Sequence, residues 1–141
     1  MAGRLQYGKR YKYPHMIGDD ANIWERFMAL FSERFETVDY DLRVGTGVPI
    51  PAGEAENYAR MMTMLSQKRI DVVGWKNESP TIIEVKRRVG LGALGQVFGY
   101  RILFENDFKH IKKPELLIVC EEITIDDRVV LEVSGVPVEV V

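Results

Sequence analysis

The sequence lacks the residues and segments on which several classes of protein depend. Cys120 is its one cysteine, so an intrachain disulfide and a cysteine-rich zinc cluster are both excluded. The two histidines, His15 and His110, lie far apart and have no zinc-binding spacing. No run of about 18 or more apolar residues could span a membrane, and the apolar stretch of about 7–15 residues that a secretory signal needs does not follow the basic start. We therefore expect a protein of a reducing compartment, located in the cytoplasm and without a membrane partner.

The size and composition indicate one folded domain. The chain has 141 residues, of which 46% are hydrophobic and 28% charged, as in an ordinary soluble domain with one core. We expect a basic arm over residues 1–18 and a single domain over residues 19–141. The glycines at 90, 92 and 95 are not followed by the Gly-Lys-Ser/Thr of a phosphate-binding loop, so we expect no nucleotide cofactor.

The net charge of −2 conceals a strong division along the chain. Residues 1–18 hold four basic and no acidic side chains, and residues 66–113 hold ten basic and five acidic ones. Residues 19–65 hold four basic and nine acidic side chains, and residues 114–141 hold one and seven. Because lysine and arginine contacts to phosphates dominate affinity for nucleic acids, the basic segments favour a nucleic-acid partner, although the net charge argues against one.

Basic and aromatic side chains alternate in the first 18 residues. Such a mixture could contact phosphates and stack on bases, and it could equally form a solvated, partly disordered N-terminus. The basic residues are Arg4, Lys9, Arg10 and Lys12, and the tyrosines are Tyr7, Tyr11 and Tyr13.

Hydrophobic periodicity predicts helices and a strand in the first half of the chain. Apolar residues from Ile23 to Phe35 recur at helical spacing after Asp19 or Asp20 as N-cap, which predicts a helix over about 20–36. Residues 38–44 alternate like a strand with one wet face, and glycines and prolines predict a loop over about 45–53. A shorter helix is expected over about 55–65, where three methionines would also suit an adaptable flap.

The second half of the chain is predicted to contain most of the sheet. Residues 68–75 and 81–86 are β-branched runs around an Asn and Pro turn, which predicts an antiparallel hairpin. A helix to about residue 105, a buried strand over 115–121 and a terminal hairpin over 129–133 and 136–141 follow, with Pro137 at a sheet edge. This order predicts an α/β domain with a mixed sheet flanked by helices and a C-terminal β appendage.

Three charged residues stand in the predicted hairpin, where apolar residues are expected. Glu84 and Lys86 are two apart in one strand and share a face, and Asp71 lies among apolar residues of the partner strand. Charges in such positions are costly unless they are paired or bound to a metal. Asp71 and Glu84 offer oxygen ligands that suit Mg²⁺, and Lys86 could orient a metal-bound water or neutralise charge on an attacked phosphate. The alternative is a chance hairpin in which Asp71 and Lys86 pair across strands.

Gln96 and Tyr100 lie four residues apart and share one face of the predicted helix. An amide and a phenol can position water or phosphate without titrating. Taken alone, the two residues are more often plain surface residues of a helix.

The spacing of these residues resembles that of the PD-(D/E)XK nuclease superfamily. Asp71, a twelve-residue gap, Glu84-Val85-Lys86 and then Gln96 follow its pattern, with Ile70 where the family name has proline. Gly92-x-x-x-Gln96-x-x-x-Tyr100 is similar in particular to the RecB-like exonuclease branch. The resemblance implies a restriction-endonuclease-like core of order α-β-β-β-α-β, in a minimal, resolvase-like form.

The resemblance also implies a role for each residue of the motif. Asp71, Glu84 and the backbone carbonyl of Val85 would bind the metal, Lys86 would be the catalytic lysine, and Gln96 with Tyr100 would support the site. Many members add a metal-binding glutamate from the first helix, for which Glu25 is the matching residue. A surface glutamate is the alternative for Glu25.

We therefore expect a Mg²⁺-dependent endo- or exodeoxyribonuclease, in which Mn²⁺ can substitute, that hydrolyses phosphodiester bonds in DNA through a metal-activated water. The expected DNA contacts are the N-terminal basic residues together with Lys68, Arg69, Arg87 and Arg88. The alternative is a catalytically inactive nuclease fold that binds nucleic acid or a protein partner, although the presence of Asp71, Glu84 and Lys86 together favours the enzyme. An inhibitor whose acidic C-terminal segment mimics DNA ranks last. So small a domain would need a homodimer or a partner for sequence-specific cutting, and it would suit a phage-encoded enzyme in the host cytoplasm.

Overall fold

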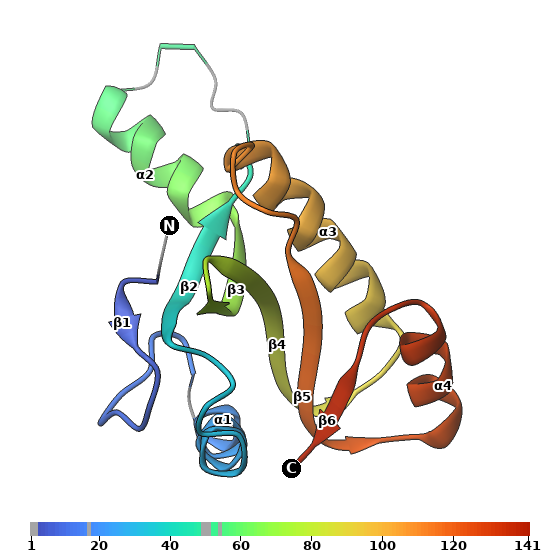
Figure 1. The fold of residues 1–141 in the computed structure, drawn as a ribbon. Coiled ribbons are helices and arrows are strands. Elements are labelled where there is room, and N and C mark those ends of the chain that lie inside the picture. Colours follow the sequence, from blue (N-terminus) through green and yellow to red (C-terminus); the bar gives the residue numbers. More distant parts are fainter. Residues whose placement is uncertain (1–2, 17, 49–51, 54) are drawn as a thin grey trace.

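One mixed sheet organises the computed structural model, which describes residues 3–16, 18–48, 52–53 and 55–141 (Figure 1). The sheet has six strands in the order β1-β2-β3-β4-β5-β6. Strands β1 to β4 pair antiparallel, while β4 with β5 and β5 with β6 pair parallel. The strands are β1 (Leu5–Gln6), β2 (Thr37–Val44), β3 (Lys68–Lys76), β4 (Ser79–Val89), β5 (Glu115–Ile123) and β6 (Val138–Val140). The predicted α/β class with a mixed sheet is confirmed.

The helices cover both faces of this sheet. They are α1 (Asp19–Leu30), α2 (Glu56–Ser66), α3 (Gly92–Asp107) and α4 (Ile125–Val133). Helix α1 packs Ile23, Trp24 and Phe27 into the core on one face, and α3 packs Val97 and Phe104 into the core on the other. Within the described ranges, no helix combines the length and apolar character needed to cross a membrane.

Helix α1 is shorter than the periodicity predicts, because it ends at Leu30 and not near residue 36. The next residues turn the chain so that Phe35 lies against the sheet, where it is buried over Gly74 of β3. A Cβ atom added to Gly74 would lie 2.7 Å from the Phe35 ring. Phe35 keeps the apolar spacing of the helix, which is why the prediction extends to it. It is nevertheless a loop residue, which packs into the same core as α1.

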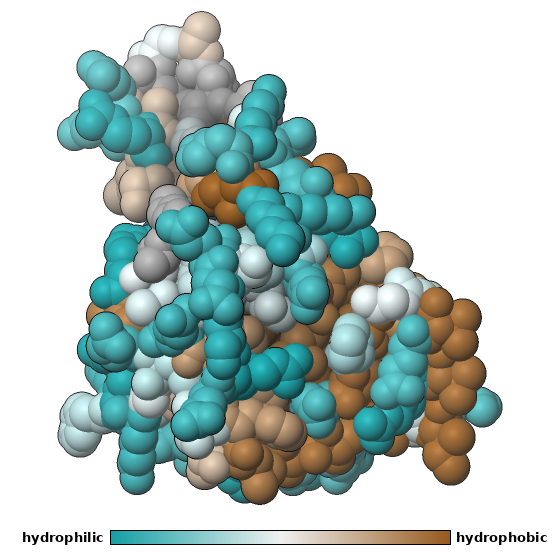
Figure 2. Space-filling model, viewed as in Figure 1, coloured by the Kyte–Doolittle hydropathy of each residue, from teal (hydrophilic) through white to brown (hydrophobic). Residues whose placement is uncertain are grey.

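The strand predicted over 129–133 is wrong, because these residues belong to α4. The Thr124 side chain caps this helix by accepting a hydrogen bond from the Asp127 amide. Two aspartates in the first turn stabilise the helix further, because their negative charge lies at the positive end of the helix dipole. The parallel pairing of β6 with β5 also requires a crossover, which a tight hairpin cannot supply. Helix α4 leaves Ile125, Val129 and Val133 exposed as an apolar patch (Figure 2).

Helix α2 confirms the helix predicted over about 55–65, but it buries none of its side chains. It extends away from the sheet (Figure 1). Part of the predicted loop over 45–53, residues 49–51, lies outside the described residues.

The basic N-terminal segment packs against the domain. Tyr13 is buried and lies edge-on to Tyr40, with its hydroxyl accepting a hydrogen bond from the Arg10 amide. Tyr7 packs against Trp24 and Phe35 and donates a hydrogen bond to the Phe31 carbonyl. Tyr11, in contrast, is fully exposed. Packing therefore occupies Tyr7 and Tyr13, and Tyr11 is the tyrosine of this segment that is open to solvent.

Helix α3 carries two glycines in its interior, Gly95 and Gly99. Each costs about 1 kcal/mol of helix stability relative to alanine. A Cβ atom added at either position would meet no other atom within 4 Å. Packing within the described part of the chain therefore does not require these glycines.

We predict that Tyr13→Ala lowers the free energy of unfolding by about 3 kcal/mol, because it removes a buried ring and leaves a cavity. The matched control Tyr11→Ala should change it by less than about 0.5 kcal/mol, since that side chain is exposed. Urea unfolding of both variants measures the difference. Equal stability of the two variants would show that the segment does not pack as described.

Candidate active site

The site forms where the ladder between β3 and β4 ends. The last paired residues are Val72 and Ile83, and continuing this register would place Asp71 opposite Glu84. Instead, the Asp71 carboxylate accepts a hydrogen bond from the Val85 amide at 3.0 Å. The Asp71 side chain thus accepts a hydrogen bond that a backbone carbonyl would accept in a regular ladder. This arrangement brings Asp71 and Glu84 together at the point where the strands separate.

A distortion of β2 accompanies this separation. Side chains two apart in a strand normally share a face, yet Tyr40 lies in the core under α1 and Leu42 packs on the α3 side. Between them, Asp41 has a left-handed backbone with φ of 54°, and its pairing with Asp71 across the ladder is missing. β3 changes face at the same place, since Ile70 lies on the α3 side and Val72 on the α1 side.

Two side chains, Arg69 and His15, hold Asp41 in the distorted segment. Both carboxylate oxygens of Asp41 accept hydrogen bonds from Arg69, at 2.8 and 2.9 Å. His15 Nε2 lies 2.9 Å from Asp41 Oδ2, and His15 itself has a positive φ of 59°. Strained backbone of this kind is common at functional sites. Arg69, predicted to contact DNA, therefore holds Asp41 in this structure.

Glu84 is buried with an unmatched oxygen. Glu84 is 7% exposed, and its Oε2 atom has no hydrogen-bond partner. Burial, then the charge of Asp71 and a hydrogen bond to it, raise the pKa of Glu84 from 4.5 to about 8, against the opposing charge of Lys86. Burial also raises the pKa of Asp71, which the Val85 amide opposes. Without a cation, the pair therefore holds a proton on Glu84 that it shares with Asp71.

A third carboxylate approaches from the start of α1, and it is Asp20. Its charge raises the pKa of both Asp71 and Glu84, and its own pKa is raised by burial and by Asp19 and lowered by Lys86. The sequence indicates Asp20 only as a helix cap. Nothing in the local pattern shows that the first turn of α1 lies beside the β3–β4 hairpin, which is about 50 residues further along the chain.

The structure does not bring Glu25 to this cluster. Glu25 lies five residues after Asp20, which turns it about 140° around the helix axis. Its carboxylate is 3.8 Å from Lys9 Nζ and lies near Tyr13, whose pKa it raises. Helix α1 thus contributes an acid to the site, but from its first turn.

Gln96 and Tyr100 face the carboxylates from α3. The two side chains lie close enough together for Gln96 to lower the pKa of Tyr100. Burial and then the charges of Glu84 and Asp71 raise the pKa of Tyr100 to about 12. Glu84 shares a strand face with Ile82, which lies in the core under α3. Lys86 is exposed on the same strand.

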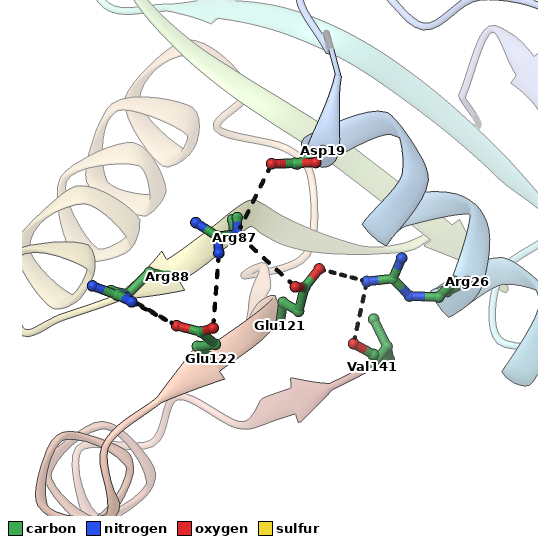
Figure 3. A network of polar contacts seen from close by, with 7 residues as sticks. All are labelled: Asp19, Arg26, Arg87, Arg88, Glu121, Glu122 and Val141. Atoms are coloured by element: carbon green, nitrogen blue, oxygen red, sulfur yellow. Dashed lines mark hydrogen bonds and ion pairs between the residues drawn. The ribbon is translucent and has the colours of Figure 1, made fainter.

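Several predicted DNA contacts are already paired with acids. Arg87 lies 3.9 Å from each of Asp19, Glu121 and Glu122, and Arg88 lies 2.9 Å from Glu122 (Figure 3). Arg26 joins the same network through Glu121 (Figure 3). In the N-terminal segment, Arg4 lies 3.2 Å from Asp39 and Lys9 pairs with Glu25. Arg10, Lys12 and Lys68 form no ion pair among the described contacts; Lys12 and Lys68 are exposed, and Arg10 is half-buried.

The donor set fits a hard divalent cation held by few protein ligands. Within the described ranges, no group of three or more His, Cys, Asp and Glu residues is arranged to hold a metal. Asp71 and Glu84 lie together, however, and the Glu84 oxygen without a partner is an available acceptor. Mg²⁺ commonly uses one or two carboxylates and keeps several waters. The pair therefore suits a Mg²⁺ ion that substrate and water would complete.

We predict that Glu84→Gln stabilises the protein at pH 8 in EDTA. Because the pKa of Glu84 is higher in the folded protein than in the unfolded chain, the folded protein is most stable below about pH 4.5, where Glu84 is protonated in both states. This stability is lost as the pH rises to about 8. The glutamine stays neutral, so the melting temperature of the variant minus that of the wild type should grow by about 3 °C or more between pH 5 and pH 8. Differential scanning calorimetry measures this difference. A constant difference across that range would contradict the burial of an ionisable Glu84.

Comparison with known proteins identifies the fold. No protein-family model and no curated protein sequence matches the chain. A repair endonuclease from Pyrococcus abyssi is similar in structure, with a TM-score of 0.53 and 14% identity over 89% of this chain and 48% of that one. The structure of an EndoMS–dsDNA2 complex is similar with a TM-score of 0.52 and 17% identity, over 95% of this chain and 48% of that one. This chain thus spans about half the length of these structures, and it shares the α/β fold of solved endonucleases.

Proposed function

We propose that this chain is a metal-dependent nuclease that hydrolyses phosphodiester bonds in DNA. The observation that carries the proposal is the buried pair of Asp71 and Glu84, in which one oxygen of Glu84 lacks a partner. A domain gains no stability from two such carboxylates, because burial raises the pKa of both. Perturbed carboxylates beside a lysine are typical of catalytic sites.

Asp71, Glu84 and the Val85 carbonyl would hold the metal ion, for which Mg²⁺ is the expected species and Mn²⁺ a substitute. When bound, such an ion polarises a phosphate and lowers the pKa of a coordinated water. The Val85 amide orients the Asp71 carboxylate, and Asp20 adds negative charge near both ligands. This charge attracts a divalent cation.

Lys86 would bind the attacked phosphate or orient the attacking water. Its charge lowers the pKa of Glu84 and of Asp20, so it lies close to both carboxylates while its side chain remains exposed to substrate. A lysine in that position stabilises negative charge that develops on the phosphate in the transition state. The Gln96 and Tyr100 pair supplies neutral donors on the α3 side.

The fold supports DNA as the substrate. The two similar structures are those of a repair endonuclease and of an EndoMS complex with double-stranded DNA. The motif of Asp71, Glu84, Lys86 and Gln96 resembles that of PD-(D/E)XK nucleases, and its two carboxylates lie together where the β3–β4 ladder ends. We infer that the chain belongs to that superfamily.

Cleavage of DNA tests the proposal. A panel of labelled single strands, duplexes, flaps and junctions is incubated with Mg²⁺, Mn²⁺ or EDTA. We expect cleavage with either metal and none with EDTA. Lys86→Ala should lower the rate about 100-fold or more, because it removes transition-state stabilisation. The matched control Lys112→Ala, an exposed lysine in another segment, should cleave like the wild type. Equal activity of Lys86→Ala and wild type would refute the assignment.

Metal binding can be measured without activity. We predict that millimolar Mg²⁺ or Mn²⁺ raises the melting temperature of the wild type by several degrees, because a ligand that binds the native state stabilises it. Asp71→Asn and Glu84→Gln should each lose most of this shift. Glu25→Gln should retain it, since Glu25 pairs with Lys9. A shift that survives both site variants would place the metal elsewhere.

A further inference from the structure

A hollow of about 290 Å³ opens on the α3 side of the sheet, beside the candidate active site. It is lined by Lys68, Gly95, Gln96, Gly99, Tyr100 and Leu103. Lys68 begins β3, and the other residues lie along one face of α3. We refer to it as the glycine hollow, because Gly95 and Gly99 form the bare part of its wall.

The two glycines have no role in packing that the described residues reveal. An added Cβ atom at either position would meet open space, yet glycine inside a helix weakens that helix. Gly74 of β3 differs from them, because an added Cβ there would collide with the Phe35 ring. A bare helix surface that the protein itself does not fill allows another molecule to approach the helix backbone.

The glycine hollow and the carboxylate site share Tyr100. Tyr100 lines the hollow, and it is also close enough to Glu84 and Asp71 for their charges to act on it. Glu84 is more than nine-tenths buried, and its oxygen without a partner lies on the strand face that α3 covers. A substrate bound at the carboxylates would therefore extend into the hollow.

The lining matches the alternating chemistry of a nucleic-acid strand. Lys68 offers an exposed ammonium group for a phosphate, and Gln96 offers an amide for a sugar or base edge. The apolar part of Leu103 and the glycine backbone offer a flat contact for a sugar or a base ring. Unlike Arg69, Arg87 and Arg88, Lys68 forms no ion pair among the described contacts.

We propose that the glycine hollow binds the DNA strand next to the cleaved phosphate, with the sugar-phosphate backbone against Gly95 and Gly99 and one phosphate at Lys68. This inference rests on the proposed function. It identifies a binding subsite on the protein, and it gives the two glycines of α3 a role in substrate binding.

The test separates binding from stability. Gly95→Ala, Gly99→Ala and Gly99→Leu each place a side chain in the hollow, and each replaces glycine with a better helix former. We expect the melting temperature to stay equal or to rise by about 2–5 °C. Asn22→Leu is the matched control, because it adds an exposed leucine to α1 on the other face of the sheet.

Affinity is measured with a fluorescein-labelled DNA duplex that carries a single-stranded tail, in the Lys86→Ala background with Mg²⁺. We expect Gly99→Leu to raise the dissociation constant about tenfold or more, and the alanine variants to raise it less, in order of added volume. Asn22→Leu should bind like its parent. Lys68→Ala should weaken binding to all sequences and lower the slope of log affinity against log salt by about one.

Three results would overturn the proposal. The first is an unchanged affinity of Gly99→Leu for the DNA. The second is an affinity that falls only in variants whose melting temperature also falls. The third is a shift of the glycine variants from dimer to monomer in sedimentation, which would make the hollow an interface between two copies of α3. Failure of the proposed function is distinguishable, because it appears as absence of metal-dependent cleavage by the wild type whatever the affinity of the glycine variants.

Discussion

The meeting of Asp71 and Glu84 at the end of the β3–β4 ladder is the constraint on which the site depends. Burial removes both carboxylates largely from water and raises the pKa of each, and the charge of Asp71 raises the pKa of Glu84 further. The Val85 amide satisfies one oxygen of Asp71, whereas one oxygen of Glu84 has no partner. Such a pair is unfavourable in a folded protein unless a proton or a cation neutralises it. This need for a neutralising partner is the basis of the proposed metal site.

The surrounding structure fixes this pair in place. The left-handed backbone at Asp41 interrupts β2 opposite Asp71, and Arg69 and His15 hold the Asp41 carboxylate. Tyr7 and Tyr13 of the segment before α1 pack on the α1 side of the sheet, next to Trp24 and Tyr40. The local cost of strain and buried charge is therefore offset by two well-packed cores on either side of the sheet. The basic N-terminal residues belong to this support as much as to any DNA-binding surface.

The distribution of charge also changes meaning in three dimensions. Arg87 and Arg88 follow Lys86 in the chain, yet carboxylates of α1 and β5 surround them (Figure 3). A phosphate would have to displace Glu121 or Glu122 to reach these arginines. Lys86 and Lys68 are exposed near the carboxylates and near α3, so they are the basic residues best placed for a substrate. A count along the sequence cannot separate these two groups, because acidic partners come from distant segments.

The sequence by itself determined the mixed α/β sheet and the hairpin, and it predicted Asp71, Glu84, Lys86, Gln96 and Tyr100 as site residues. These features depend on local periodicity and on short spacings within neighbouring elements. Only the tertiary structure decided that Asp20 and not Glu25 approaches the carboxylates, that Arg69 and Arg87 are held by acids, and that residues 129–133 are helical. Each of these outcomes depends on the direction in which a helix or strand presents a side chain to a distant segment. That direction is set by packing across the sheet, which a local pattern does not contain.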